Sequence, residues 1–420
     1  MNTACRWSVL LLLVVALPAV TNGAEPAKAE WPQFLGPQRN GISAETGLLE
    51  TWPSGGPKVV WRQAGGVGMS GLVISRGRLI TVIERAGKQQ LIALSADKGT
   101  EIWATELAPA FRNAMGNGTR ATPAIDGDMV FAFTGEGVLT AVDFATGRQI
   151  WSKDTLGVLN SKQAEYGMAC SPLVVGENVV VTAGSGNQTV AAFNKKSGAL
   201  AWSSGKDPIG YSSPTLLDVA GKKQLVAFTG ASVLGLDPNT GVEAWRYPYQ
   251  TEYDCNIATP VSYKGQVFIS AGENHGSVLL SLKPTNAGFE ASEVWSSQGA
   301  KSVLRTEWQT AILLGDYLYG FDNVGGAGPI SHLTCVHAAT GEVAWQKARF
   351  GKGNMIAADG KLFLSTMLGE LVVLKPSPKA YEEIGRMEVL GSTRQAPALA
   401  GGLLYLRDDK EIVCVDVRKN

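Results

Sequence analysis

The chain has 420 residues, of which 45% are hydrophobic, and its 37 basic side chains balance its 37 acidic ones. This length can bury a large core, while the balanced charge excludes a strong global field of either sign. No run of Lys and Arg exceeds two residues, so we expect no nucleic-acid partner. Short apolar runs separated by Gly, Asn and Asp, with 50 glycines in all, predict strands rather than helices.

The N-terminus has the pattern of an export signal. Arg6 places a positive charge before the apolar stretch 8–20, and small residues follow at Gly23 and Ala24. The stretch is shorter than the ~20 residues that cross a membrane as a helix. We therefore expect a signal peptide at 1–23, cleaved near Gly23 and Ala24, and an exported protein, periplasmic or extracellular, that does not span the membrane.

A repeated unit follows, which consists of a strand, a tight turn and a second strand that ends in Trp. A short polar side chain opens the turn, Gly supplies a positive φ that closes it, and the Trp covers a neighbouring sheet. Successive Trp positions, with Met387 as one equivalent, are 42 to 51 residues apart, a spacing typical of propeller blades. The five clearest copies are Ser95/Gly99/Trp103, Asp143/Gly147/Trp151, Asn194/Gly198/Trp202, Asp237/Gly241/Trp245 and His337/Gly341/Trp345.

The two ends of the chain supply the last pair of strands. The strand 411–416 has no partner after it, and the strand 57–61 has no hairpin before it. Pairing them removes an open sheet edge and completes the ring. The predicted fold is all-β, an eight-bladed β-propeller of four-stranded antiparallel blades over residues 57–420. A lead-in segment, 24–56, precedes it, and we expect a monomer.

The cysteines give no sign of a metal or redox centre. Cys335 and Cys414 occupy the repeat position that Ala141 fills elsewhere, so we interpret both as small buried residues. There is no adjacent Cys pair and no Cys-x-x-Cys motif. Whether Cys170 and Cys255 form a disulfide stays open at this point.

These residues resemble the PQQ-like, or quinoprotein-type, propeller repeat, which is marked by Leu-Asp-x-x-Thr-Gly-x-x-x-Trp. The resemblance extends from Trp31 to Asn420. Quinoprotein alcohol dehydrogenases, the BamB-type outer-membrane assembly subunit and many secreted bacterial propellers without an assigned activity share this repeat. The segments 31–41, 211–214 and 251–260 resemble the last group most. The resemblance thus implies the fold and leaves the function open.

The links between an outer strand and the next inner strand should all lie on one face of the disc. The long ones are 104–120, 152–169, 246–257 and 296–308, and long loops around one end of a channel are the usual ligand site. Arg112, Asn113, Tyr166 and Glu252 are further polar residues of these links. Our candidates for binding a cofactor or other ligand at the channel mouth are Arg120, Asn256, Trp308, Asn354, Arg394, Glu165, Asp254, Arg305 and Glu307.

Two functions remain as alternatives. A third possibility is that the channel mouth is hydrated and binds no ligand. The first function is a non-catalytic binding or scaffold module of the cell envelope, with a protein partner or a small polar ligand at the long-loop face. The second is a PQQ-dependent oxidoreductase acting on an alcohol or sugar, with PQQ and Ca²⁺ as cofactors.

The resemblance itself counts against the second function. Quinoprotein alcohol dehydrogenases carry an adjacent disulfide-bonded Cys pair, which is missing here. Their calcium ligands come from separate blades, whereas Glu252, Asp254 and Asn256 share one link. We predict no catalytic residue and no metal-binding residue.

Overall fold

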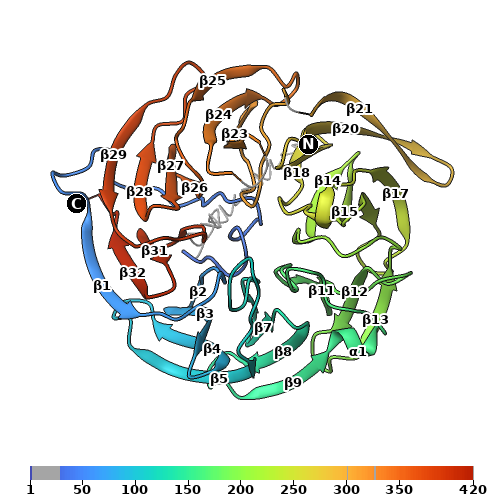
Figure 1. Cartoon of the computed structure of the whole chain (residues 1–420), viewed down its shortest axis with the longest axis horizontal. Helices are drawn as coiled ribbons and strands as arrows, with labels where there is room; N and C mark the ends of the chain where they lie inside the picture. Colours follow the sequence, from blue (N-terminus) through green and yellow to red (C-terminus); the bar gives the residue numbers. More distant parts are fainter. Residues whose placement is uncertain (2–28, 300, 326–327, 420) are drawn as a thin grey trace.

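The computed structural model describes residues 1, 29–299, 301–325 and 328–419. Apart from Met1, the expected signal peptide lies outside the described residues. The described chain forms eight four-stranded antiparallel sheets arranged in a ring around a central axis (Figure 1). Among its helices, none is long and apolar enough to cross a membrane. The predicted eight-bladed β-propeller is therefore confirmed.

The first four blades follow the chain in order, each running from an inner to an outer strand. Blade 1 contains β2 (Val73–Ser75), β3 (Arg78–Arg85), β4 (Lys88–Ser95) and β5 (Glu101–Pro109). Blade 2 contains β6 (Ala124–Asp126), β7 (Met129–Phe133), β8 (Val138–Asp143) and β9 (Gln149–Asp154). Blade 3 contains β10 (Leu173–Val175), β11 (Asn178–Thr182), β12 (Val190–Asn194) and β13 (Leu200–Ser204). Blade 4 contains β14 (Thr215–Val219), β15 (Lys222–Phe228), β16 (Ser232–Leu236) and β17 (Glu243–Pro248).

The last four blades complete the ring, and blade 8 takes its outer strand from the N-terminus. Blade 5 contains β18 (Val261–Tyr263), β19 (Gln266–Ala271), β20 (Gly276–Thr285) and β21 (Gly288–Gln298). Blade 6 contains β22 (Ile312–Leu314), β23 (Tyr317–Asn323), β24 (Ser331–His337) and β25 (Val343–Lys347). Blade 7 contains β26 (Gly353–Ala358), β27 (Lys361–Thr366), β28 (Glu370–Leu374) and β29 (Glu383–Glu388). Blade 8 contains β30 (Ala398–Ala400), β31 (Leu403–Arg407), β32 (Glu411–Asp416) and β1 (Lys58–Ala64).

The ring closes by the pairing of the two terminal strands, as the sequence predicted. Strand β1 pairs antiparallel with β32, from Lys58 opposite Asp416 to Ala64 opposite Glu411, with a bulge before Trp61. The closing strand gives the C-terminal strand a partner on its outer side, so blade 8 has the same four strands as the others.

At five of the eight blade junctions, the repeated Trp packs on the turn glycine of the next blade. Gly147 has a φ of +73°, and a Cβ on it would lie 2.6 Å from the ring of Trp103 in the preceding blade. The indole Nε1 of Trp103 also donates a hydrogen bond of 3.1 Å to the Phe144 carbonyl. Gly99 meets Trp61 in the same way, at 2.7 Å. The glycine therefore provides both the turn and the flat surface on which the indole packs.

Two tryptophans lack a partner glycine in the next blade. Trp345 of blade 6 keeps the indole hydrogen bond, which it donates to the Ser377 carbonyl of blade 7 at 2.6 Å.

The junction after Trp245 departs further. Trp245 of blade 4 shares a hydrophobic cluster with Leu280 and Phe289 of the long β20–β21 hairpin of blade 5, and no glycine of that hairpin meets its ring. Its indole instead donates a hydrogen bond of 2.6 Å to the Gln224 side chain of its own blade. Gly235, the residue paired with Trp245, leaves the space for this ring.

The cysteine predictions can now be judged. Cys335 pairs with Trp345 and Cys414 with Trp61, as Ala141 pairs with Trp151, and both cysteines are fully buried. The interpretation of these two residues as small core residues is confirmed. Cys170 and Cys255, whose pairing the sequence left open, are both free thiols.

The lead-in segment crosses the middle of the ring at the level of the inner strands (Figure 1). Trp31 bridges to Ile74 in blade 1, and Ile42 bridges to Ala357 in blade 7. Between them, the buried Arg39 donates a hydrogen bond of 2.6 Å to the Ser171 carbonyl, next to blade 3. The segment therefore ties together inner strands from several blades.

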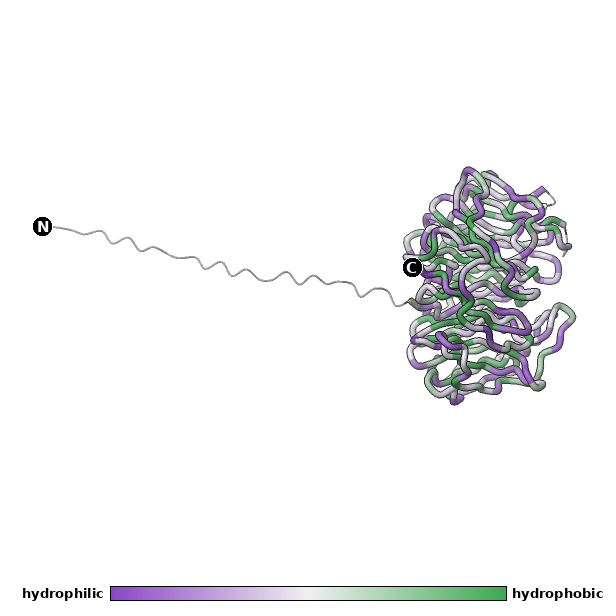
Figure 2. The backbone as a smooth tube through the Cα atoms, turned by 90° about the vertical axis from the view of Figure 1, so that its left-hand side faces the viewer, coloured by the Kyte–Doolittle hydropathy of each residue, from purple (hydrophilic) through white to green (hydrophobic). Residues whose placement is uncertain are grey.

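The two faces of the disc differ in their loops. Figure 2 shows the disc edge-on, with hydrophobic stretches of the strands between the loops of both faces. We call the face that carries the links from outer to inner strands the link face, and the opposite one the turn face. The long links begin later than predicted, because β5, β9, β17 and β21 continue up to six residues past the predicted starts, for example to Pro109. A short helix, α1 (Thr155–Val158), and a 3-10 turn, η1 (Glu252–Asp254), lie within these links.

Candidate binding face

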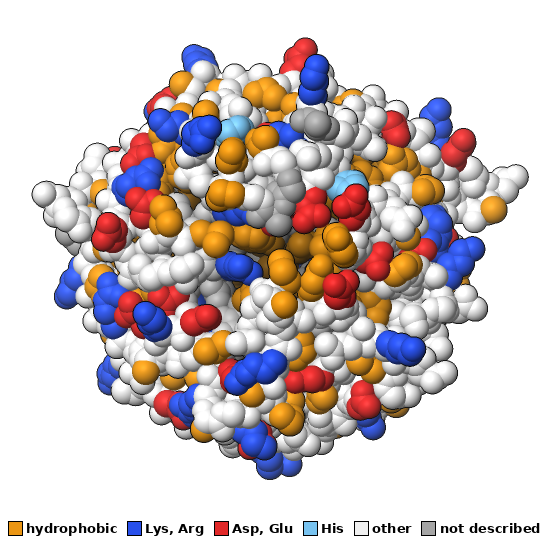
Figure 3. All heavy atoms as spheres, in the orientation of Figure 1, with side chains coloured by type: hydrophobic (Ala, Val, Ile, Leu, Met, Phe, Trp, Pro, Cys, Tyr) orange, Lys and Arg blue, Asp and Glu red, His pale blue; other side chains and the backbone are white. Residues whose placement is uncertain are grey.

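Hydrophobic side chains gather near the centre of the link face, with acidic and basic ones between them (Figure 3). Large apolar or aromatic side chains are also strongly exposed on the loops of this face. Leu368 is 81% exposed, Tyr253 61%, and Met115 and Val158 47% each. Apolar side chains that gather on one face and are surrounded by charge are typical of protein interaction sites.

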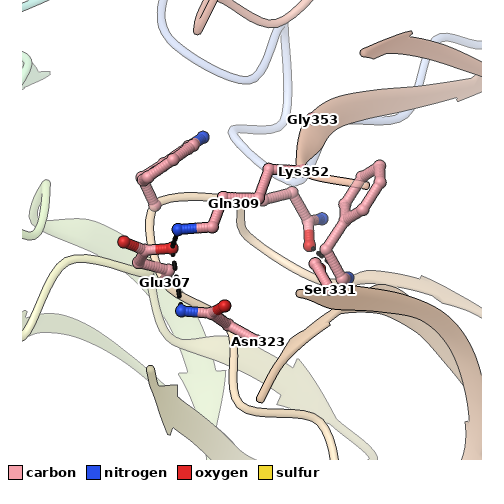
Figure 4. A pocket seen from close by; sticks show the side chains of 8 residues that line it. Glu307, Gln309, Asn323, Ser331, Lys352 and Gly353 are labelled. Atoms are coloured by element: carbon pink, nitrogen blue, oxygen red, sulfur yellow. Dashed lines mark hydrogen bonds and ion pairs between the residues drawn. The ribbon is translucent and has the colours of Figure 1, made fainter. Parts of the chain in front are cut away.

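At the channel mouth, the predicted residue Glu307 has partners in the protein itself. The Lys352 Nζ lies 2.5 Å from Glu307 Oε2, and the Asn323 amide donates a hydrogen bond of 2.9 Å to the same oxygen (Figure 4). Burial raises the pKa of Glu307, and the hydrogen bond from Lys352 opposes that effect. The cavity between these residues measures about 10 Å³, which is room for one water molecule.

Two predicted arginines fix the loops around this mouth. The Arg394 guanidinium lies 5.4 Å from the Trp308 ring centroid and donates a hydrogen bond of 3.0 Å to the Met115 carbonyl. Arg120 donates hydrogen bonds of 2.9 and 3.0 Å to two carbonyls of its own loop. Burial lowers the pKa of Arg120 to about 10, so it stays positive at neutral pH. The predicted Asn354 donates a hydrogen bond of 2.7 Å to the Arg394 carbonyl.

The structure places two other predicted residues in the framework of the fold instead. Arg305 is buried and forms a two-pronged ion pair with Asp322, with N–O distances of 2.7 and 2.8 Å. Asn256 is fully buried, and its amide donates hydrogen bonds to the carbonyls of Thr229 and Tyr249. Both residues lie in links that lead to an inner strand, but their side chains turn back toward partners in neighbouring segments.

The remaining predicted residues, Glu165 and Asp254, line a second cavity of about 250 Å³ at the link face. We call it the side cavity. Its walls come from the links before blades 3, 4 and 5 and from the β11–β12 turn, and include Tyr211 and Tyr253. Burial raises the pKa of Asp254, and the negative charge of Glu165 adds to the effect.

Three residues that matter here were not among the sequence candidates. Lys352 holds Glu307 at the mouth, and Tyr211 and Tyr253 line the side cavity. Both tyrosines stand in the segments 211–214 and 251–260, which the resemblance had already singled out. Lys352 lies in a short link, without a motif that would have marked it.

The residues present do not fit PQQ with a calcium ion. Within the described residues there is no group of three or more His, Cys, Asp or Glu side chains that could hold a metal ion. The cavity that Lys352 and Glu307 line at the mouth has room for one water molecule. The roomier side cavity presents the carboxylates of Glu165 and Asp254, which would repel the three carboxylates of PQQ.

These features define a class of protein: a closed eight-bladed propeller with a binding face made of its inter-blade links. The family model described as "Outer membrane protein assembly factor BamB" matches residues 53–164 and 88–347, which together exceed half of the chain. The chain belongs to this family of PQQ-like propellers.

Relatives with known names share the repeat at low identity. The outer membrane protein assembly factor BamB of Yersinia pestis is 22% identical over 319 residues, covering 74% of this chain and 76% of its own. The protein of the same name from Shewanella oneidensis is 24% identical over 252 residues, covering 59% of this chain and 61% of its own.

Solved structures share the fold. Quinohemoprotein alcohol dehydrogenase from Comamonas testosteroni superposes with a TM-score of 0.68 at 14% identity, covering 93% of this chain and 81% of that one. BamB from Moraxella catarrhalis superposes with a TM-score of 0.57 at 16% identity, covering 84% of this chain and 97% of that one.

Proposed function

We propose that this protein is a non-catalytic scaffold of the cell envelope that binds a protein partner through its link face. One observation carries the proposal. The charged side chains at the channel mouth are engaged with the protein itself around a cavity of about 10 Å³, whereas Tyr253 and Leu368 are exposed on the same face. Small-molecule sites usually have a larger open cavity with converging polar groups, and the side cavity, at about 250 Å³, also lies below their usual range of about 300 to 1,000 Å³.

The relatives favour the same function. The BamB proteins of Yersinia pestis and Shewanella oneidensis are named outer membrane protein assembly factors, so we infer an assembly or scaffold role for this chain as well. Such a role requires export, for which we propose a signal peptide at 1–23, cleaved near Gly23 and Ala24. The mature protein would then comprise the lead-in, 24–56, and the propeller, 57–420, as a monomer in the periplasm or outside the cell.

The first experiment separates this function from a PQQ-dependent oxidoreductase. The purified protein is incubated with PQQ and Ca²⁺, and its unfolding and its dye-linked activity toward alcohols and sugars are measured. Saturation at 100 times Kd would stabilise the protein by about 2.7 kcal/mol. We expect neither stabilisation nor dye reduction, and either signal would contradict the proposal.

The second experiment concerns the partner. Tagged wild-type protein and the double variant Tyr253→Ala/Leu368→Ser are used to capture proteins from envelope extracts. The matched control is Val242→Ser, because Val242 is 64% exposed but lies in a turn on the opposite face. We expect the same partner with wild type and control and its loss with the double variant. Equal capture by all three would rule out the link face.

A further inference from the structure

The side cavity has the size of a pocket for one side chain. It measures about 250 Å³, below the range of about 300 to 1,000 Å³ in which small-molecule sites usually fall. It opens on the link face, where four separate loops meet at its walls. If that face binds a protein, as proposed above, the cavity is placed to receive one residue from the partner.

The charge of the cavity favours a cation. Glu165 and Asp254 both line it, and in the part of the chain that the structure describes neither carboxylate has a hydrogen bond or a salt bridge. The lysine in the wall, Lys162, is exposed and likewise forms no ion pair with them there. The neighbouring thiol of Cys255 is affected by the same negative charges. Burial, together with the charges of Glu273, Asp254 and Glu165, raises the pKa of Cys255 to about 12.

The aromatic lining favours a flat cation. Tyr211 is buried in the wall and packs beside Tyr166, with ring centroids 5.6 Å apart. Its hydroxyl accepts a hydrogen bond of 3.2 Å from the Tyr166 amide, and burial raises its pKa well above the ordinary value, so the ring stays neutral. Tyr253 stands exposed at the rim, with a φ of +58°. Guanidinium groups stack on such rings and pair with carboxylates through two parallel hydrogen bonds.

We propose that the side cavity receives an arginine side chain of the protein partner, held between the carboxylates of Glu165 and Asp254 and the tyrosine rings of its wall. Arginine is enriched among the residues that dominate protein interfaces, where it typically fills a pocket of the other protein. This inference rests on the proposed function and assigns a chemistry to the partner.

The test uses the full exported protein and a capped pentapeptide, Gly-Gly-Arg-Gly-Gly. Its counterpart carries citrulline, which keeps the shape of arginine and lacks the charge. Ligand-observed NMR titration gives both dissociation constants. We expect the arginine peptide to bind with a Kd below about 10 mM and the citrulline peptide at least about tenfold more weakly. No binding of the arginine peptide in this range, or equal binding of the two, would overturn the inference.

Variants locate the binding. Glu165→Gln/Asp254→Asn should weaken binding of the arginine peptide at least about tenfold and leave the melting temperature unchanged, because neither carboxylate forms a hydrogen bond or salt bridge within the described residues. Glu252→Gln is the matched control, since this exposed carboxylate lies on the same 3-10 turn outside the cavity. Unchanged binding by the double variant would contradict the assignment. Tighter binding of free L-arginine than of the peptide would mean that a metabolite is the ligand instead.

The same variants separate this inference from the proposed function. If Glu165→Gln/Asp254→Asn still captures the partner that Tyr253→Ala/Leu368→Ser loses, the arginine anchor is wrong and the scaffold function stands. If wild type captures no partner while the arginine peptide binds selectively in the cavity, the proposed function fails and the guanidinium site remains. Loss of the partner with both double variants supports the two together.

Discussion

The seam where the two ends of the chain meet, with β1 on β32 and blade 8 against blade 1, and the side cavity on the link face treat their charged groups in opposite ways. At the seam, Arg407 is 1% exposed and donates hydrogen bonds to Gly66, Val82 and other groups of blade 1 and the link before it. In the side cavity, Glu165 and Asp254 have no such partner within the described chain. The two terminal nitrogens of Arg407 are bonded within the fold, whereas the carboxylates of the side cavity are available to another molecule.

This comparison predicts two separate kinds of variant. Changes at the seam should lower stability without a specific effect on binding. Changes on the link face should remove binding and leave stability as it is. Each prediction below tests one side of that separation, in order of the expected effect on the free energy of unfolding.

The largest effect should follow deletion of residues 24–64. The deletion removes β1 together with Trp61, and it exposes the edge of β32, which β1 covers along its whole length. We expect a loss larger than the ~4–5 kcal/mol that marks exceptional single substitutions, with some aggregation through the open edge. Denaturant unfolding measures it. A deletion of 24–28 is the control, and equal melting of all three proteins would refute the closure.

Arg407→Ala should have the next largest effect. Its guanidinium donates hydrogen bonds to Gly66 O at 2.6 Å, Val82 O at 2.8 Å and Thr81 Oγ1 at 2.9 Å. Truncation leaves these buried acceptors without a donor and opens a cavity, which should cost about 3 to 5 kcal/mol. Chemical denaturation compares it with Arg148→Ala, an exposed arginine. A loss below about 1 kcal/mol would show that Arg407 does not hold the seam.

Gly147→Ala should destabilise the protein by about 3 kcal/mol. The added Cβ would lie 2.6 Å from the Trp103 ring, at a φ of +73° that favours glycine. Gly127→Ala is the control, because its φ of +55° is also positive but nothing lies within 4 Å of the added carbon. We expect about 1 kcal/mol there. Equal losses at the two positions in urea unfolding would mean that the Trp103 contact contributes nothing.

Tyr253→Ala should change stability least, by no more than about 0.5 kcal/mol, because the side chain is 61% exposed. Its backbone φ of +58° is equally unfavourable for Tyr and Ala, which both carry a Cβ, so the substitution adds no strain. The same variant should weaken partner capture, measured by surface binding to the captured partner. A reduced melting temperature with intact partner capture would contradict the separation, because Tyr253 would then serve the fold and not binding.

The fold could be predicted because its signals are local and repeated. The turn glycines and the tryptophans form contacts between adjacent blades, such as Gly147 with Trp103. Their spacing in the sequence therefore reflects the length of one blade. The closing pair was found because each terminal strand lacked a neighbour in sequence. The reorientation of Trp245 could not be predicted, since it depends on the length of a hairpin in the next blade.

The candidate site could be predicted only in part, because a position before an inner strand does not fix where the side chain points. Arg394 and Arg305 occupy comparable links, yet Arg394 lies over Trp308 while Arg305 pairs with the buried Asp322. The partner that decides the outcome is distant in sequence. The side cavity could not be predicted either, because its walls come from four loops that are separate in the sequence.

The most direct test of the account is to cross-link the partner from defined positions. A photoreactive phenylalanine analogue replaces Tyr253 or Leu368 on the link face, or Val242 on the turn face, all three being exposed. After irradiation in intact cells, the account predicts one shared cross-linked protein from positions 253 and 368 and none from position 242. Cross-links from position 242 alone, or no protein cross-link from either link-face position, would contradict it.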